Sequence, residues 1–230
     1  MPTSTVEDYL KSILLAEGDD PVELVSTGRV AAALEVAPGT VTAMMKTLAE
    51  SGLVAYEPYS GVRLTPAGRQ LALHVLRRHR LVELFLVKIM KMDWSAVHGE
   101  AERLEHVVSD ALIQRMDEML GHPVTDPHGD PIPDASGEVK ERDLTSLLFC
   151  ATGERFRVAR VIDQSPEFLQ FLERQGLRPG VFVRVVTRNE AADTVELSLE
   201  NGRDFSLGYR AASKVLVASP ALEGARRGAP

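Results

Sequence analysis

The chain has 230 residues, and its 44% hydrophobic and 26% charged fractions are those of an ordinary folded globular protein. Its net charge of −7 argues against a protein that coats nucleic acid nonspecifically, and no apolar run reaches the roughly 18 residues of a membrane span. We therefore expect two or three small domains and no membrane partner. The N-terminus lacks a signal-peptide pattern, and a single cysteine, which cannot form an internal disulfide, favours a cytoplasmic location.

Residues 1–66 predict a winged helix-turn-helix. Apolar residues recur at helical spacing over 5–17, and two shorter helices are predicted over 28–35 and 40–51. A turn containing Pro and Gly separates the two short helices, as in helix-turn-helix domains. The segment 52–65 then predicts a hairpin, which would form the wing. An unrelated helical segment followed by a hairpin is the alternative interpretation.

The second short helix is the predicted recognition helix. Its side chains are small, so they can contact thymine methyls and phosphates but make few bidentate contacts with bases. Sequence choice is therefore expected to depend on DNA shape. Helix capping and surface filling are the alternative role for its two threonines. The residues predicted to lie nearest the DNA are Pro38, Thr40, Thr42, Ala43 and Lys46.

Residues 67–134 predict a helical domain. Pro66 begins a long helix that extends to about Lys91, and its apolar residues exceed one stripe, which favours a dimer interface. One or two further helices are predicted over 95–121. A loop rich in Pro, Gly and Asp completes the segment.

From about Leu144 the pattern changes to short strands with tight connections, interrupted by a helix over 166–174. Five such strands predict a small, partly open β-barrel over 144–220. The fold class is thus mainly α with α+β additions. The single cysteine, Cys150, has apolar neighbours and is predicted to be a buried structural thiol. The tail after Pro220 is expected to be disordered.

Six side chains that can bind metal fall at helical spacings in the middle of the chain. They are His79, Glu83, His98, Glu102, Glu105 and His106. With an advance of about 100° per residue, the last four form one narrow stripe, and the first two lie on one helix face. Such a stripe repels itself unless protons or a cation neutralise it, which favours a divalent-metal site of mixed nitrogen and oxygen ligands. A solvated helix face is the alternative. His122 and His128, in the loop, are interpreted as surface residues.

In this arrangement the chain resembles the diphtheria toxin repressor family of metal-dependent transcriptional regulators along essentially its whole length. The segments that carry the resemblance are V-E-D-Y-L near the start, R-H-R-L-V-E, H-G-E-A-E-R-L-E-H-V-V-S-D and H-G-D-P-I-P. The resemblance implies a winged-helix DNA-binding domain, a helical metal-binding and dimerisation domain and a C-terminal SH3-like barrel. It also implies a homodimer that binds double-stranded operator DNA, and two metal sites per subunit.

The resemblance assigns residues to both sites. The primary site would use Asp8, Glu102, Glu105 and His106. The ancillary site would use His79, Glu83 and His98, completed by Gln164 and Glu167 of the barrel. These two barrel residues precede a Phe at the family's spacing but in swapped order.

Two departures bear on the choice of metal. Iron-responsive members resemble this chain but carry Met and Cys where Asp8 and Glu102 stand, and carboxylates harden the site toward Mn²⁺. Manganese-responsive members usually carry Glu where Lys11 stands, which helps to hold a second ion close to the first, and usually lack the barrel. We therefore expect two separate sites, with Mn²⁺ favoured over Fe²⁺. Affinity order alone would favour Zn²⁺ or Cu²⁺, so cellular availability must share in the selectivity.

The expected function is metal-responsive control of metal-homeostasis genes, without enzymatic activity. One ion joining Asp8 to Glu102, Glu105 and His106 would fix two DNA-binding heads for successive major grooves. An iron-responsive regulator is the nearest alternative. A dinuclear-metal enzyme is less favoured, because ligands from three chain regions would enclose the ion. A further alternative is a winged-helix protein whose barrel senses a peptide or small molecule.

Overall fold

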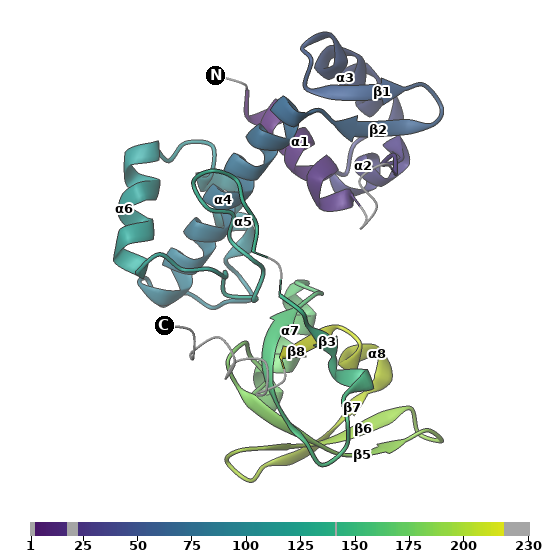
Figure 1. Ribbon diagram of the computed structural model, residues 1–230, viewed down its shortest axis with the longest axis vertical. Coiled ribbons are helices and arrows are strands. Elements are labelled where there is room, and N and C mark those ends of the chain that lie inside the picture. Colours follow the sequence, from purple (N-terminus) through teal and green to yellow (C-terminus); the bar gives the residue numbers. More distant parts are fainter. Residues whose placement is uncertain (1–2, 18–22, 141, 219–230) are drawn as a thin grey trace, which may run out of the picture. The chain divides into compact units, whose positions relative to one another are not determined.

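The computed structural model describes residues 3–17, 23–140 and 142–218. The chain divides into two compact units (Figure 1). The first comprises residues 1–82, 101–119 and 132–139, and the second comprises residues 83–100, 120–131 and the chain from 140 onward. The boundary falls between Val82 and Glu83, inside one continuous helix. The tail after Pro220, predicted to be disordered, lies outside the described residues.

Helix α1 (Ser4–Ala16) opens the first unit. Thr3 caps it, because its hydroxyl oxygen accepts a hydrogen bond from the backbone N–H of Val6 at 3.4 Å. One face of α1 is buried in the core of this unit through Tyr9, Leu10 and Ile13. The position of α1 is therefore tied to the helices that follow.

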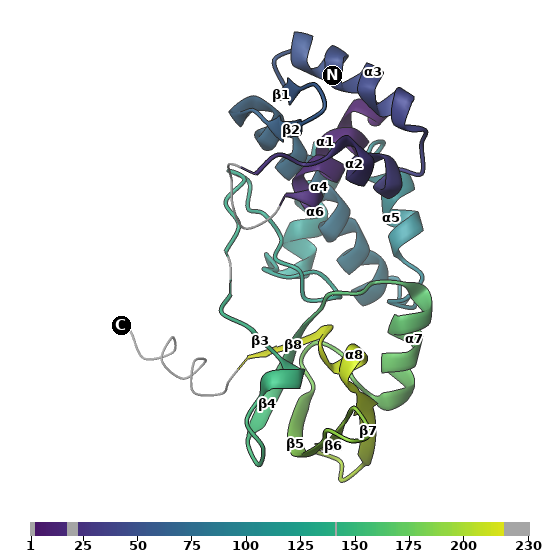
Figure 2. The same cartoon turned by 90° about the vertical axis from the view of Figure 1, so that its right-hand side faces the viewer.

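The helix-turn-helix and wing follow α1, as predicted (Figure 2). The elements are α2 (Thr27–Ala33), α3 (Pro38–Glu50), β1 (Val54–Glu57) and β2 (Gly61–Leu64). Helix α3 begins two residues before the predicted start, because Pro38 occupies its first turn, where a missing N–H costs nothing. Val30, Val41 and Met45 bring α2 and α3 into the same core as α1.

The wing is joined to the next helix, α4 (Pro66–Lys88), by a close backbone contact. A Cβ atom on Gly68 would lie 1.9 Å from the carbonyl oxygen of Leu53, so only glycine fits there. The Thr65 hydroxyl donates to the Gly52 carbonyl at 2.8 Å and accepts from the Gly68 N–H at 3.1 Å. These contacts fix the direction in which α4 leaves the wing.

Two helices, α5 (His98–Leu104) and α6 (Asp110–Leu120), occupy the segment for which one or two were predicted. The chain turns between them, and the Ser109 hydroxyl accepts from the Leu112 N–H at 3.4 Å at the start of α6. In the first unit Arg77 of α4 binds Asp117 of α6 at 3.0 Å and the Pro133 carbonyl at 2.7 Å. The arginine thereby joins α4, α6 and the loop after α6.

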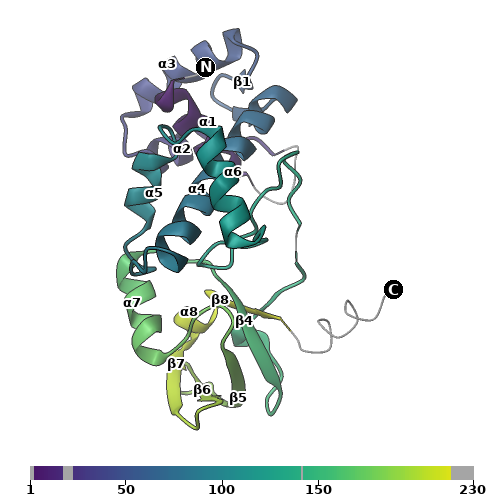
Figure 3. The same cartoon turned by 90° about the vertical axis from the view of Figure 1, so that its left-hand side faces the viewer.

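The second unit contains a small six-stranded antiparallel sheet (Figure 3). Its order is β3 (Thr145–Ser146), β8 (Val215–Ala218), β4 (Arg155–Val161), β5 (Phe182–Asn189), β6 (Thr194–Leu199) and β7 (Asp204–Gly208). The 3₁₀ helix η1 (Leu147–Phe149) and the helices α7 (Pro166–Gln175) and α8 (Tyr209–Ala212) accompany it. The predicted fold class, with a winged helix, a helical domain and a β-rich C-terminal domain, is confirmed, and the sheet has one more short strand than predicted.

Cys150 lies in the core of this sheet domain, with 3% of its surface exposed. Burial raises the pKa of its thiol to about 11, although the nearby Arg188 guanidinium opposes the shift. The prediction of a buried structural thiol is confirmed. Among the described residues, none of the helices combines the length and apolar content that a bilayer crossing needs.

Candidate metal centre

The first unit gathers three of the four residues predicted for the primary site. Asp8, Glu105 and His106 each offer one ligand atom within 4.8 Å of the others. His106 Nε2 lies 2.8 Å from Asp8 Oδ1 and 3.3 Å from Glu105 Oε1. The ligands are nitrogen and oxygen, and they come from α1 and from the turn after α5.

Glu7, which the sequence reasoning missed, lies beside this cluster. Its Oε2 is 2.6 Å from His106 Nδ1. Burial opposes protonation of His106, but the hydrogen bond to Glu7 and the charge of Asp8 raise the pKa of the imidazole above its ordinary value. Burial raises the pKa of the Asp8 carboxyl, and the adjacent His106 partly opposes that shift. The cluster thus attracts a positive charge, which a proton or a metal ion can supply.

Glu105 is the most buried member, with no exposed surface. Its Oε1 lies 2.5 Å from the ammonium nitrogen of Lys11, and its Oε2 lies 2.5 Å from His79 Nδ1. Burial would raise the pKa of Glu105, but the hydrogen bond to His79 and the charges of His79 and Lys11 hold it below its ordinary value. Glu105 is therefore a carboxylate in the buried cluster.

Glu102, the fourth predicted primary ligand, lies at the edge of the cluster. Its side chain is 53% exposed, and its Oε1 is 3.9 Å from Lys11 Nζ. The predicted stripe assumed one continuous helix, whereas α5 ends at Leu104 and the following turn carries Glu105 and His106. The assignment of Glu102 as a ligand stays a prediction.

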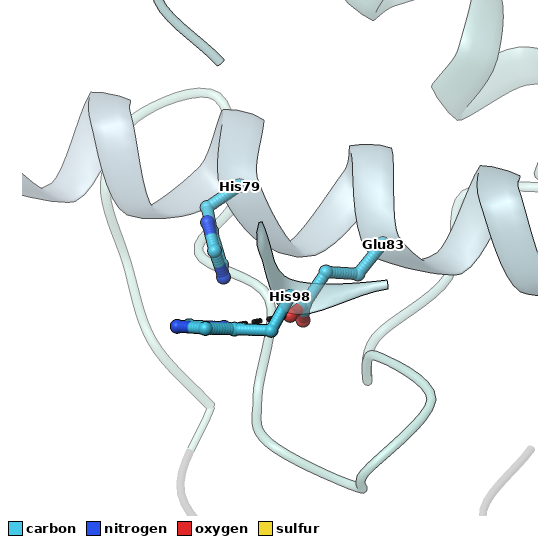
Figure 4. A group of neighbouring side chains, drawn as sticks. All are labelled: His79, Glu83 and His98. Carbon is cyan, nitrogen blue, oxygen red and sulfur yellow. Dashed lines mark hydrogen bonds and ion pairs between the residues drawn. The ribbon is translucent and has the colours of Figure 1, made fainter. Parts of the chain in front are cut away.

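A second group of possible ligands includes Glu83, of which 1% is exposed. Its Oε1 lies 3.2 Å from His98 Nδ1 in the second unit. His79 precedes Glu83 by one turn of the continuous helix α4, and both side chains project from the same helix face (Figure 4). His79, Glu83 and His98 offer ligand atoms within 4.8 Å of one another, and their assignment to the ancillary site stays a prediction.

His128 was predicted to be a surface residue, and this prediction was wrong. It has 1% of its surface exposed and stacks on Trp94, with ring centroids 5.6 Å apart. The loop around it is folded by Asp126, whose Oδ1 accepts from the N–H groups of His128 and Asp130 at 2.8 and 2.9 Å. Gly129 permits this fold, because a Cβ there would lie 1.9 Å from the Ala159 carbonyl oxygen. His122 is exposed, as predicted.

The two nitrogens of His128 have different surroundings. Nε2 lies 2.9 Å from the Trp94 carbonyl oxygen, which only an N–H can bind, so the other nitrogen carries the lone pair in the neutral ring. That nitrogen, Nδ1, is buried without a hydrogen-bond partner among the described residues and lies 3.7 Å from Glu83 Oε2. Glu83, Asp126 and His128 form a further group with ligand atoms within 4.8 Å. Burial opposes protonation of His128, but Glu83 and Asp126 raise the pKa of the imidazole above its ordinary value. The position between Nδ1 and Glu83 therefore suits a positive charge, which a proton or a divalent ion can supply.

The two barrel residues predicted for the ancillary site lie elsewhere. Gln164 donates through Nε2 to Asp130 Oδ2, and Glu167 is exposed in the first turn of α7. Glu167 does not belong to the groups of potential carboxylate, imidazole and thiolate ligands found among the described residues. The role of Gln164 and Glu167 in metal binding stays a prediction. Asp126 and His128 had a signal in the sequence, D-P-H-G-D, whose alternate polar residues form a compact loop.

The predicted DNA-contact residues lie on α3. Pro38, Thr40, Ala43 and Lys46 are exposed. Thr42 is half-buried, and its hydroxyl donates to the Pro38 carbonyl at 3.1 Å within the helix. The exposed face of α3 therefore carries one cation and several small side chains, and their contact with DNA stays a prediction.

The family comparisons divide the chain into three matches. Residues 1–62 match the N-terminal DNA-binding domain of the iron-dependent repressors, and residues 65–134 match their metal-binding and dimerisation domain. Residues 145–219 match the FeoA domain.

Individual relatives cover most of the chain. It is 33% identical to the diphtheria toxin repressor of Corynebacterium efficiens over 192 residues, which covers 79% of this chain and 83% of the relative. It is 37% identical to the iron-dependent repressor IdeR of Mycobacterium leprae over 131 residues, which covers 56% of this chain and 55% of the relative. A manganese-dependent transcriptional repressor solved with manganese superposes with a TM-score of 0.83 at 40% identity, covering 93% of this chain and 99% of the other.

A winged helix, a helical domain with buried carboxylate and imidazole clusters, and a small β-rich domain define a metal-dependent transcriptional repressor. The chain belongs to the diphtheria toxin repressor family, whose members bind DNA and dimerise and are not enzymes. Divalent-metal binding resides in the dimerisation domain of this family.

Proposed function

We propose that the protein is a manganese-responsive repressor that binds operator DNA as a homodimer and controls metal-homeostasis genes in the cytoplasm. The observation that carries this proposal is the ligand set of the primary cluster, Asp8, Glu105 and His106. It contains two carboxylates and one imidazole and no sulfur. Hard oxygen ligands favour Mn²⁺ over ions that prefer thiolate or thioether.

The path from metal to DNA runs through α1. An ion bound by Asp8, Glu105 and His106 would join α1 to the turn after α5. The opposite face of α1 lies in one core with α2 and the recognition helix α3. Holding Asp8 therefore restrains the recognition helix. The entropy that is lost when this helix is ordered is then offset by the free energy of metal binding and not by that of DNA binding.

The second metal position is proposed around Glu83. His98 Nδ1 and His128 Nδ1 approach different oxygens of Glu83, at 3.2 and 3.7 Å. His79 and Asp126 are the remaining candidates in the two groups that share Glu83. We retain Gln164 and Glu167 as predicted ligands for a loaded state and propose two sites per subunit.

The proposed domains are the winged helix over 1–66, the metal-binding and dimerisation domain over 67–134 and the barrel over 144–220. Two recognition helices of a dimer would enter successive major grooves about one duplex turn apart. The proposed contacts to DNA are Pro38, Thr40, Thr42, Ala43 and Lys46.

An iron-responsive repressor is the second candidate, because two of the relatives' names describe repressors of iron or diphtheria-toxin type. Operator selection from genomic fragments, run in parallel with Mn²⁺, Fe²⁺, Zn²⁺ and a chelator, separates the two. Stronger operator binding with Mn²⁺ than with Fe²⁺ at matched free concentrations supports the proposal. The reverse order establishes the iron-responsive alternative, and equal binding in chelator contradicts both.

A further inference from the structure

Lys11 lies inside the primary cluster. It stands on α1, one turn after Glu7 and three residues after Asp8, and its side chain is 9% exposed. Its ammonium nitrogen is 2.5 Å from Glu105 Oε1 and 3.9 Å from Glu102 Oε1. The cluster therefore already contains a cation that belongs to the chain.

The Lys11 ammonium binds the same oxygen, Glu105 Oε1, that a metal ion at this site would use. Glu105 Oε1 also lies 3.3 Å from His106 Nε2, so it is the Glu105 atom that faces the other proposed ligands. The second carboxylate oxygen is held by His79. Both oxygens of Glu105 are thus engaged, and an ion at Oε1 must either share that oxygen with the ammonium or displace it.

We propose that Lys11 is an intramolecular competitor of the divalent ion and sets the metal concentration at which the regulator loads. In the metal-free protein the ammonium neutralises the buried Glu105 carboxylate. When the ion enters, it takes Oε1, and the ammonium leaves because two cations at one oxygen repel each other. This inference rests on the proposed function, since it concerns the same primary site.

The exchange changes how α1 is held. In the structure, α1 is joined to Glu105 through Lys11 and to His106 through Glu7 and Asp8. With metal, the link to Glu105 passes through Asp8 and the ion, one helical turn earlier. The net free energy gained on metal binding is smaller by the free energy of the Lys11–Glu105 ion pair, which the metal ion replaces. A weaker apparent affinity is the expected consequence.

A purely structural role for Lys11 makes the opposite prediction. If the Lys11–Glu105 ion pair only held α1 in place, its loss would disorder the ligands and weaken metal binding. If Lys11 competes with the ion, its loss leaves Glu105 without that cation, which destabilises the metal-free fold and strengthens metal binding. The two roles therefore predict changes of opposite sign in the metal affinity of a Lys11 variant.

The test compares the full-length Lys11→Met and Lys11→Gln proteins with wild type. Methionine keeps the unbranched stem and the helix propensity without the charge. We expect Mn²⁺ affinity at the primary site, measured by calorimetry, to rise roughly ten- to hundredfold, the effect of one hydrogen bond between charged groups. In chelator, both variants should have a lower melting temperature than the wild type, and Mn²⁺ should remove this difference. Lys88→Met, at an exposed lysine in the last turn of α4, should change neither.

Equal or weaker Mn²⁺ affinity in Lys11→Gln or Lys11→Met overturns the inference while leaving the proposed function standing, provided the wild type binds the ion. A wild type that takes up no ion overturns both. If both variants unfold in chelator, the side-chain nitrogen signal of Lys11 in ¹⁵N-lysine-labelled wild type decides the question during a titration with diamagnetic Cd²⁺. A shift to a solvent-exchanging signal supports displacement, and an unchanged signal overturns it.

Discussion

Glu7 and His106 form a carboxylate–imidazole pair, with Glu7 Oε2 2.6 Å from His106 Nδ1. Since Glu7 holds Nδ1, the other ring nitrogen is directed at Asp8 and Glu105, where the ion is proposed to bind. A hydrogen-bonded carboxylate behind a histidine ligand fixes the ring and increases its basicity. We therefore expect Glu7 to position His106 for metal binding without being a ligand itself.

Glu7→Ala should weaken the first Mn²⁺ equivalent by roughly 10- to 100-fold, as loss of such a partner does in other metal sites. Glu7→Gln keeps an oxygen that can accept from Nδ1–H and should lose less. Calorimetry gives the affinities, and the imidazole NMR signals of His106 report whether Nδ1 loses its hydrogen bond. Wild-type affinity in Glu7→Ala would show that the pair has no part in metal binding.

Asp8→Ala should separate metal uptake from switching. Glu105 and His106 remain to hold an ion weakly, but the link to α1 is lost. We expect residual Mn²⁺ uptake by calorimetry together with a large loss of Mn²⁺-stimulated operator binding. Glu50→Ala, at the exposed end of α3, is a control for altered charge in the same unit. Full stimulation in Asp8→Ala would disprove the proposed path through α1.

His128→Asn should weaken the second Mn²⁺ equivalent and leave the first unchanged, because the buried Nδ1 facing Glu83 is removed. A loss of roughly tenfold or more is expected for one protein ligand, about 1.4 kcal/mol. The exposed histidine in His122→Asn provides the matched control. Glu167→Gln tests the barrel ligand predicted from the sequence. If Glu167→Gln loses the second equivalent and His128→Asn does not, the site is completed by the barrel and not by the loop.

Asp163 pairs with Lys214 at 2.5 Å in the sheet domain. The hydrogen bond from Lys214, with further ones from Ser165, lowers the pKa of Asp163 from 3.8 to about 2. The carboxylate therefore stabilises the fold above pH 3.8, and this contribution is lost as the pH falls through about 2. Asp163→Asn should cost ~1–2 kcal/mol at pH 7 in urea unfolding, with a smaller difference at pH 3.

The control for this measurement is Asp193→Asn, an exposed turn residue with φ of 51°, a conformation that asparagine adopts readily. It should unfold like the wild type at both pH values. A cost for Asp163→Asn that is the same at pH 7 and pH 3 would mean that the ionised pair is not its origin.

Lys46 is the exposed cation on α3. Lys46→Ala should weaken operator binding similarly for different operator sequences and reduce the slope of log affinity against log salt by about 1 per subunit, as expected for a phosphate contact. Fluorescence anisotropy over a range of salt concentrations measures both. A change confined to one operator base would instead assign Lys46 to base recognition.

The sequence predicted the elements whose physics is local. The winged helix followed from helical periodicity, from Pro38 and from the glycine-rich turns, and the sheet domain followed from alternating strands. The spacing of His79 and Glu83 was sufficient to place both on one face of α4, since a helix fixes the relation between residues four apart. Cys150 was recognised as buried from its apolar neighbours.

The rest depended on contacts between distant segments. The chain leaves helical geometry after Leu104, so the predicted stripe of four is divided. Glu105 and His106 meet Asp8, Glu102 lies at the edge of that cluster, and His98 belongs to the group with Glu83. His128 looked like a surface loop residue because its burial comes from Trp94 and from strand β4, which are far away in the sequence.

Residue types and their spacing by themselves predicted a cluster of carboxylates and imidazoles and a DNA-binding head, because those properties depend on local periodicity and on side-chain chemistry. Only the tertiary structure decided which atoms meet. It brought Lys11 and His79 to the two different oxygens of the buried Glu105 carboxylate, and it placed Glu7 against Nδ1 of His106. No local rule predicts such contacts, because they join side chains 26 to 99 residues apart, whose distance is set by the packing of whole helices.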